Sequence, residues 1–256
     1  MHTIFRSALL SLFIAGTGMQ WFSENHISAG EPVRIVMVGD STMASYSKPP
    51  EDRPDLTGWG QVFGEFFDGD VQIFNHAVSG RSSRNFRTEG HWQKALDRKP
   101  DYIFIQFGHN DRASQKERFS DPETDFRTHL KEYVQESRDA GAKPILITPV
   151  AVRSLKEGKV VDSLQPYVEA TLIVAKETET PVIDLHKLSV EAFEKIGEPA
   201  GQDLNPKPID HTHFSRKGAQ LVAGLVASEL PSAEPTLAKR LLPEPMTNAP
   251  KTQPAP

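Results

Sequence analysis

The sequence predicts an α/β fold in which helices cover both faces of a parallel sheet. Five short apolar runs, rich in β-branched residues, have the length and composition of buried parallel strands. Helical patterns stand between these runs, and the chain shows no internal repeat or second domain. Alternating strands and helices imply right-handed crossovers and therefore a doubly wound sheet.

The expected elements follow in chain order. The apolar runs that predict strands cover residues 33–39, 71–78, 101–108, 144–150 and 181–185. Helical patterns cover residues 59–67, 125–141, 164–177, 189–197 and 215–230. Gly141 is a typical C-cap for the second of these helices, and Ser215 is a favourable N-cap for the last.

The amino-acid composition excludes some classes of function. A chain of 256 residues with 38% hydrophobic residues is enough for one substantial core. The net charge of -5 argues against a global affinity for nucleic acid or anionic membranes. The sequence contains no cysteine, which excludes a disulfide framework, a thiolate nucleophile and a thiolate metal site.

Both ends of the chain differ from the middle. Arg6, the apolar segment 8–16 and the small residues Ser28 and Ala29 at the expected cleavage site are typical of a signal peptide covering residues 1–29. We therefore expect a secreted or periplasmic protein that is not held in a membrane after cleavage. The catalytic domain is expected over 30–230, and the proline-rich segment 231–256 is expected to be a disordered tail in which only 236–242 forms a short docked turn.

Polar residues with catalytic capability follow the expected strands. In open parallel sheets, ligands bind beyond the carboxyl ends of the strands. The residues at this edge are Gly39-Asp40-Ser41, Ser79-Gly80-Arg81, Gly108-His109-Asn110-Asp111 and, before the last helix, Asp210-His211-Thr212-His213. The sequence therefore predicts a site along this edge.

These residues suit a serine hydrolase. A serine becomes a nucleophile when a base takes its proton, and the three-residue spacing of Asp210 and His213 lets the carboxylate orient the imidazole for that task. The Asn110 amide can donate to a developing oxyanion, and Gly80 permits a close approach of its backbone N–H. Ser41 is thus the expected nucleophile, although a serine at this place also suits a helix cap.

At these four places the sequence resembles the SGNH (GDSL-type) hydrolases. The matching blocks are GDSTM with Ser41, NHAVSGRSS with Gly80, FGHND with Asn110 and DHTHFS with Asp210 and His213. The residues in these blocks are most similar to those of the rhamnogalacturonan acetylesterase branch. The resemblance implies a three-layer α/β/α sandwich with a flavodoxin-like five-stranded parallel sheet. It also implies an oxyanion hole formed by the N–H groups of Ser41 and Gly80 and the Asn110 side chain.

The implied activity is removal of O-acetyl groups from a plant-type polysaccharide, most simply a pectic one, through an acetyl-serine intermediate. No metal or cofactor is expected, and we expect a monomer whose partner is the acetylated polysaccharide or oligosaccharide. Arg81, Arg84 and Arg87 follow the second strand, and arginine suits bidentate contact with the carboxylates of an acidic glycan. The alternative for these arginines is pairing with nearby acids to hold the loop.

Other functions stay open at this point. An acetylxylan or general carbohydrate acetylesterase, and a lipase or thioesterase of the same fold, would use the same catalytic residues. A non-catalytic carbohydrate-binding protein could keep the fold. His211 and His213 form a His-x-His pair that suits a two-metal phosphoesterase, but the first strand is not followed by an Asp-x-His pair.

Overall fold

The computed structural model describes residues 31–112 and 117–243. At its centre lies a parallel five-stranded sheet with the order β2-β1-β3-β4-β7. The strands are β1 (Val33–Gly39), β2 (Val71–Asn75), β3 (Tyr102–Gln106), β4 (Lys143–Ile147) and β7 (Val182–Ile183). All five expected strands are confirmed, but four are shorter than their apolar runs, because residues such as Phe107 and Val150 are buried in loops beyond the sheet.

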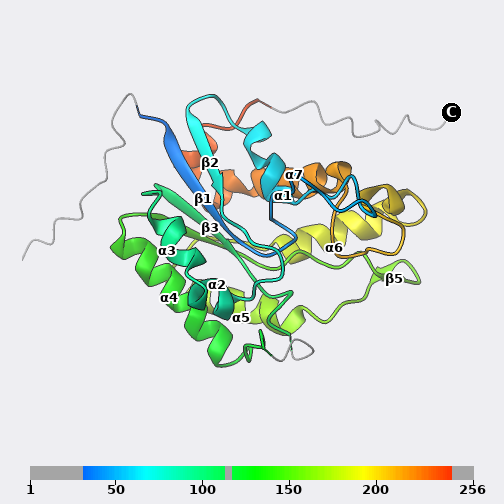
Figure 1. Cartoon of the computed structure of the whole chain (residues 1–256), viewed down its shortest axis with the longest axis horizontal. Helices are drawn as coiled ribbons and strands as arrows, with labels where there is room; N and C mark the ends of the chain where they lie inside the picture. Colours follow the sequence, from blue (N-terminus) through cyan, green and yellow to red (C-terminus); the bar gives the residue numbers. More distant parts are fainter. Residues whose placement is uncertain (1–30, 113–116, 244–256) are drawn as a thin grey trace, which may run out of the picture.

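Helices cover both faces of this sheet, which makes the predicted three-layer α/β/α sandwich (Figure 1). One layer contains α1 (Trp59–Val62), the 3-10 turn η1 (Phe63–Phe66), α6 (Leu185–Ile196), α7 (Arg216–Ala233) and α8 (Pro235–Ala238). The other layer contains α2 (Ser83–Thr88), α3 (His91–Leu96), α4 (Asp125–Asp139) and α5 (Gln165–Glu177). As expected, Ser215 caps α7, since its side chain accepts a hydrogen bond from the Gly218 N–H.

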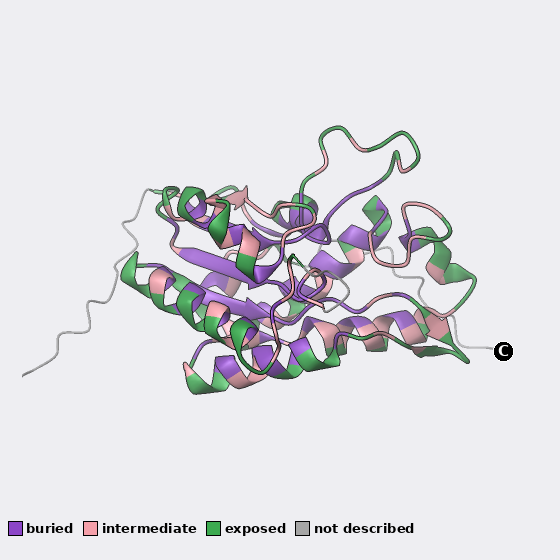
Figure 2. Cartoon of the chain, turned by 60° about the horizontal axis from the view of Figure 1, so that its bottom comes forward, coloured by how far each residue is buried: buried purple, intermediate pink, exposed green. Residues whose placement is uncertain are grey.

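Side chains of the central strands alternate between the two layers. In β1, Ile35 and Met37 belong to the core beneath α7, while Val36 and Val38 belong to the core beneath α4 and α5. Both faces of the sheet are therefore covered by helices and shielded from water, which explains why the strands have continuous apolar sequences. Figure 2 shows the buried strands between helices whose outer surfaces are exposed.

The order of the strands determines where on the sheet the candidate site lies. β1 lies between β2 and β3, so the chain leaves β1 toward one side of the sheet and returns later to the other. This is the topological switch point, where ligands bind in open α/β sheets. Ser41 follows β1 by two residues and Asn110 follows β3, so both stand at this point.

A small hairpin was not expected from the sequence. β5 (Leu155–Lys156) and β6 (Lys159–Val160) pair antiparallel, and Glu157 and Gly158 between them have φ values of 52° and 75°. Positive φ at both central residues is the geometry of a tight hairpin turn. Just before β5, the Arg153 N–H donates to the His211 carbonyl, so this segment borders the Asp210–His213 loop.

The expected boundary at residue 230 is wrong. α7 continues through Pro231 to Ala233, and α8 follows as the docked turn expected within 236–242. Leu237 is 1% exposed, and Leu241 forms a bridge with Phe67. Proline-rich composition suggests low burial, but these two leucines pack against the α7 layer and order the segment up to residue 243.

The remaining end segments cannot be compared with the structure. The expected signal peptide, residues 1–29, and the last part of the expected tail, residues 244–256, lie outside the described residues. Within the described part of the chain, no helix has both the length and the apolar character needed to cross a bilayer.

Candidate active site

The turn after β1 is built around Asp40. This carboxylate is fully buried, and its Oδ1 accepts hydrogen bonds from the Thr42 N–H at 2.9 Å and the Thr42 hydroxyl at 2.8 Å. The Thr42 hydroxyl in turn accepts from Gln106 of β3, and Tyr46 donates to the Ser41 carbonyl. Asp40 therefore orders the turn that presents Ser41.

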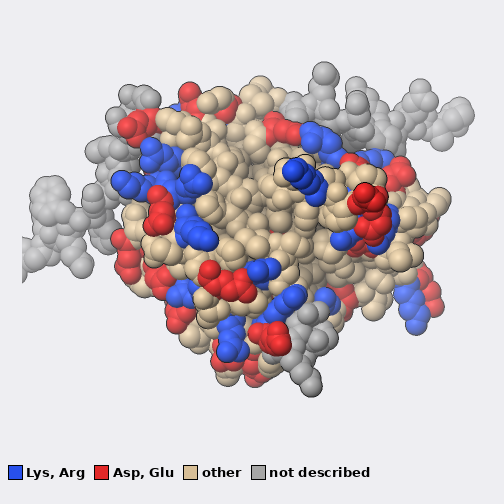
Figure 3. Space-filling model, in the orientation of Figure 1, with Lys and Arg blue, Asp and Glu red and all other residues tan. Residues whose placement is uncertain are grey.

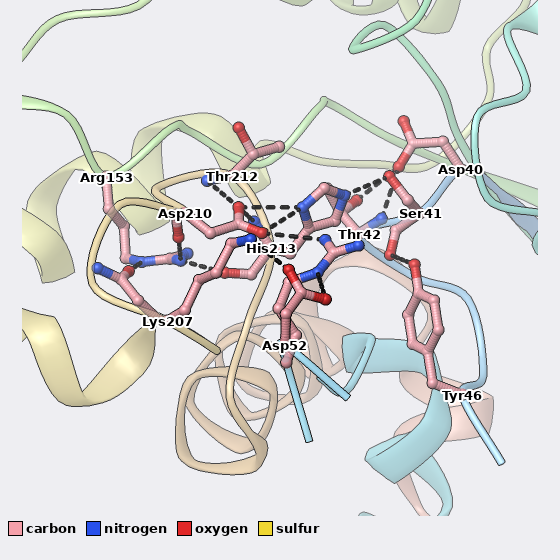
Figure 4. Close-up of polar contacts among 12 residues, drawn as sticks. Asp40, Ser41, Thr42, Tyr46, Asp52, Arg153, Lys207, Asp210, Thr212 and His213 are labelled. Carbon is pink, nitrogen blue, oxygen red and sulfur yellow. Dashed lines mark hydrogen bonds and ion pairs between the residues drawn. The ribbon is translucent and has the colours of Figure 1, made fainter. Parts of the chain in front are cut away.

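Three residues from the two ends of the domain meet at this turn (Figure 4). Ser41 Oγ lies 2.9 Å from His213 Nε2, and His213 Nδ1 lies 3.0 Å from both carboxylate oxygens of Asp210. An imidazole that donates its Nδ1–H to a carboxylate leaves Nε2 free to accept the serine proton. The arrangement is that of a nucleophile, a base and an orienting acid.

The Asp210 carboxylate is held in its ionised form. Burial alone would raise its pKa, but hydrogen bonds from the His213 side chain and backbone, together with Arg53, hold the pKa well below the usual range. Its Oδ1 also accepts from the Thr212 N–H at 3.2 Å. Asp210 thus keeps its negative charge and its orientation toward His213 at any ordinary pH.

A buried arginine supports the loop from the other side. Arg153 is 2% exposed, and its Nη2 donates to the carbonyl oxygens of Asp210 and His213 (Figure 4). Its Nε donates to Asn205 at 2.6 Å, and its guanidinium lies 4.5 Å from the centre of the Phe214 ring. Burial lowers the pKa of Arg153 to about 10. The sequence reasoning missed this residue, which comes six positions after the end of β4, one more than separates Gly80 from the end of β2.

The expected oxyanion donors lie on the loops after β1, β2 and β3. The backbone N–H groups of Ser41 and Gly80 make no hydrogen bond within 31–112 and 117–243. Gly80 has a φ of +77°, a conformation that favours glycine. Asn110 donates one Nδ2–H to the Arg81 carbonyl at 3.1 Å, which leaves its second N–H available.

Asp111 joins the loops that carry these donors. Its fully buried carboxylate accepts from the Ser83 hydroxyl at 2.6 Å, from the Ser83 N–H at 3.0 Å and from the Gly108 N–H at 3.1 Å. Burial raises the pKa of Asp111 to about 7. Through these hydrogen bonds Asp111 connects the second and third blocks.

Comparison with known proteins shows the family to which this chain belongs. A model of the GDSL-like lipase/acylhydrolase family matches residues 37–221. The chain belongs to this family. It is therefore a carboxylic ester hydrolase, and the matched region contains every residue of the candidate site.

Two curated relatives come from Bacillus subtilis (strain 168). The rhamnogalacturonan acetylesterase RhgT is 37% identical over 212 residues, which cover 77% of this chain and 89% of RhgT. The probable rhamnogalacturonan acetylesterase YesY is 36% identical over 203 residues, which cover 75% of this chain and 90% of YesY. The similarity thus extends over most of both relatives.

Solved structures agree on the fold. The Bacillus subtilis protein YxiM superposes with a TM-score of 0.68 at 29% identity, covering 78% of this chain and 56% of YxiM. Axe2, an acetylxylan esterase from Geobacillus stearothermophilus, has a TM-score of 0.59 at 20% identity, covering 78% of this chain and 95% of Axe2. At that identity Axe2 shows the fold alone.

In this family member, the three arginines after β2 do not share one role. Arg81 pairs with Glu89 at 2.8 Å, and Arg87 pairs with Glu136 and Glu132. Arg84 is exposed and forms no ion pair with the described residues. The basic patch expected from the sequence is therefore partly neutralised within the protein, because acids on the same loop and on α4 take up two of its charges.

The other histidines near the site have different surroundings. His109 is buried, and its Nε2 lies 2.9 Å from the Val150 carbonyl, which suits a structural role. His211 does not share the position of His213, since only His213 contacts Ser41 and Asp210. Among the residues with described positions, no three His, Asp or Glu side chains lie close enough together to hold a metal ion.

Proposed function

We propose that this chain is a serine esterase that removes O-acetyl groups from a pectic polysaccharide of the rhamnogalacturonan type. The observation that carries the proposal is the continuous path from Asp210 through His213 to Ser41, with a final Nε2–Oγ distance of 2.9 Å. The similarity to RhgT and YesY supports the substrate class, since both are named for rhamnogalacturonan acetyl esters.

Acylation begins at Ser41. His213 Nε2 takes the hydroxyl proton while Oγ attacks the acetyl carbonyl carbon, and the carbonyl oxygen becomes an oxyanion. The N–H groups of Ser41 and Gly80 and the Asn110 amide are the available donors for that charge. The tetrahedral intermediate then breaks its bond to the sugar oxygen, which receives the proton from His213 and leaves as the free hydroxyl.

Deacylation repeats these steps with water. His213 removes a proton from a water molecule, whose oxygen attacks the acetyl-serine carbonyl. Collapse of the second intermediate releases acetate, and the proton returns to Ser41 Oγ. Asp210 keeps its charge throughout and stabilises the imidazolium formed in each step.

The preference for an acidic glycan depends on few side chains. Arg118 lies beside the oxyanion donors: its Nη1 is 3.4 Å from Asn110 Oδ1 and 3.4 Å from where a Cβ on Gly80 would stand. Neither Arg118 nor Arg84 has a carboxylate partner in the described part of the chain. On the face shown in Figure 3, both basic and acidic groups surround a broad uncharged area. A carboxylate-bearing substrate would thus be recognised by these individual arginines.

An acetate-release assay tests the substrate class. Acetylated rhamnogalacturonan, acetylated xylan and aryl esters from acetate to octanoate would be compared by kcat/KM, with Ser41→Ala as the inactive control. We expect the acidic glycan and the shortest acyl chain to be preferred. A preference for xylan would contradict the pectic substrate and leave a general carbohydrate acetylesterase, whereas a preference for octanoate would favour a lipase or thioesterase.

Arginine variants test the recognition of charge. Arg118→Gln and Arg84→Gln should lower kcat/KM on the acidic glycan more than on aryl acetate, and added salt should shrink that difference. Arg87→Gln is the matched control, since Arg87 is engaged by Glu136 and Glu132. Equal losses on both substrates for Arg118→Gln would contradict a role in reading the substrate charge.

We also propose that the enzyme is exported and that its mature chain begins near Gly30. The basic and apolar pattern that precedes Ala29 supports this proposal. Mass spectrometry of protein from the medium or periplasm of the natural host would show the new N-terminus. Retention of Met1 in that protein would contradict cleavage.

A further inference from the structure

Arg53 contacts the carboxylate that orients the proposed base. It lies in the loop between the Ser41 turn and α1, and its Nη1 is 3.1 Å from Asp210 Oδ2. His213 Nδ1 is 3.0 Å from the same oxygen. The guanidinium and the imidazole therefore share one carboxylate oxygen. The Arg53 side chain is 25% exposed and that of Asp210 is 10% exposed, so water screens this pair only in part.

A second ion pair joins the same two loops without touching the catalytic residues. Lys207 Nζ lies 2.6 Å from Asp52 Oδ2, next in sequence to Arg53. Both pairs therefore tie the loop after Ser41 to the loop before His213. Asp52 Oδ1 also lies 3.9 Å from Arg53 Nε, so Asp52 is shared between Lys207 and Arg53. Of the two cations, only Arg53 contacts Asp210, which makes Lys207 the comparison for Arg53.

The groups that surround the imidazole come from four segments. They are Asp210 on its own loop, Asp40, Tyr46 and Arg53 after β1, His109 after β3, and Arg153 after β4. Asp40 Oδ1 accepts from Thr42, while its Oδ2 has no hydrogen-bond partner among the described residues, and Arg153 contacts backbone carbonyls. Arg53 is therefore the cation in this group that offsets the Asp210 carboxylate directly.

We propose that Arg53 is a positioning residue that adjusts the charge of the Asp210–His213 pair and so extends activity toward acid pH. This inference rests on the proposed serine esterase mechanism. A carboxylate shared with a guanidinium attracts an imidazolium less strongly than a carboxylate that faces the imidazole alone. Only the unprotonated imidazole can accept the Ser41 proton, so the charge that the Asp210 carboxylate presents to the imidazole bears on the acid limb of activity.

The size of the effect follows from distance. Since Arg53 Nη1 and His213 Nδ1 both lie about 3 Å from one oxygen, they are at most about 6 Å apart, where a screened unit charge displaces a titration by about 0.5–1 pH unit. Arg53→Gln should therefore move the acid limb of kcat/KM upward by that amount. The maximum rate should fall less, because the Thr212 and His213 N–H groups still hold Asp210.

The experiment compares Arg53→Gln with Lys207→Gln, which removes the same charge and a pair between the same loops. kcat/KM on an aryl acetate is measured from pH 4 to pH 9, and the imidazole of His213 is titrated by NMR, with its signal assigned by its loss in His213→Gln. We expect the acid limb and the imidazole titration to move upward together in Arg53→Gln. Both should stay near wild type in Lys207→Gln and in Arg53→Lys, which keeps the charge.

Several outcomes would overturn the inference. They are an unchanged or downward-shifted titration in folded Arg53→Gln, an equal shift in Lys207→Gln, and a shift in Arg53→Lys as large as that in Arg53→Gln. If wild type hydrolyses no ester, the proposed function fails. The NMR titration then still tests the charge effect of Arg53 separately, because it needs no turnover.

Discussion

Ser41 and His213 stand 172 positions apart in the chain, yet their side chains lie within hydrogen-bond distance. Each is presented by a short turn with its own local order, the Asp40 turn for the serine and the Asp210 turn for the histidine. The chemistry therefore depends on backbone geometry that nearby side chains set. At this scale the two histidines of the DHTH segment are clearly different, because only one faces the serine.

The first prediction separates these histidines. His213→Ala should lower kcat by at least about 10³-fold, because the base and the leaving-group acid are lost together. His211→Ala should change kcat little, since no hydrogen bond joins the His211 ring to Ser41 or Asp210. Steady-state kinetics on an aryl acetate would measure both, and equal losses would contradict the assignment of His213 as the base.

The second prediction concerns Arg153. Arg153→Met keeps an apolar stem against Phe214 but leaves the carbonyls of Asp210 and His213 without their donor. We expect the free energy of unfolding to fall by about 1–3 kcal/mol and kcat to fall more than KM changes. Urea denaturation and kinetics would measure the two effects. Unchanged kcat in a folded Arg153→Met protein would show that the loop keeps its geometry without this arginine.

At the scale of elements, the loops after β2 and β3 act as one unit. Asp111 accepts hydrogen bonds from the start of α2 and from Gly108, and its backbone carbonyl accepts from the Tyr167 hydroxyl of α5 at 2.6 Å. The proposed oxyanion donors, Gly80 and Asn110, are thereby fixed relative to each other. Within the described part of the chain no cation pairs with this buried carboxylate, so its ionisation has a cost.

The third prediction follows from that cost. Because burial raises the folded-state pKa of Asp111 to about 7, above its unfolded value, the favourable contribution is complete at acid pH and is lost as pH rises toward 7. The free energy of unfolding of wild type relative to Asp111→Asn should therefore fall by as much as about 4 kcal/mol between pH 4 and pH 7 and level off above. Urea denaturation across this range would test it, and a difference that rises with pH would contradict it.

The whole molecule includes more of the C-terminal region than its composition suggests. Residues 231–243 pack within the α7 layer, where Leu237 is buried and Arg240 pairs with Asp70 beside β2. These contacts add to the core on the side of the sheet opposite α4. The segment is therefore part of the folded domain.

The fourth prediction tests this packing. Leu237→Ala should lower the free energy of unfolding by about 2–4 kcal/mol, since it removes a fully buried side chain. Leu242→Ala is the matched control, because Leu242 is 42% exposed and should cost much less. Thermal and urea unfolding would compare the two variants. Similar small losses in both would show that the C-terminal segment does not contribute to the core.

The sequence by itself determined the strands, the main helices and the residues at the sheet edge. Those features depend on local signals: apolar runs, capping residues and short polar motifs whose spacing is set within one turn. It therefore predicted a site at Ser41, Gly80, Asn110, Asp210 and His213, and the structure brings Ser41, His213 and Asp210 into hydrogen-bond contact.

Only the tertiary structure decided which charges are available and what supports the site. Arg81 and Arg87 are paired with acids, while Arg53 and Arg153 reach the Asp210–His213 loop from distant parts of the chain. Such pairings depend on side chains brought together by folding, which local sequence patterns do not encode. For the same reason the docking of Leu237 could not be read from its proline-rich surroundings.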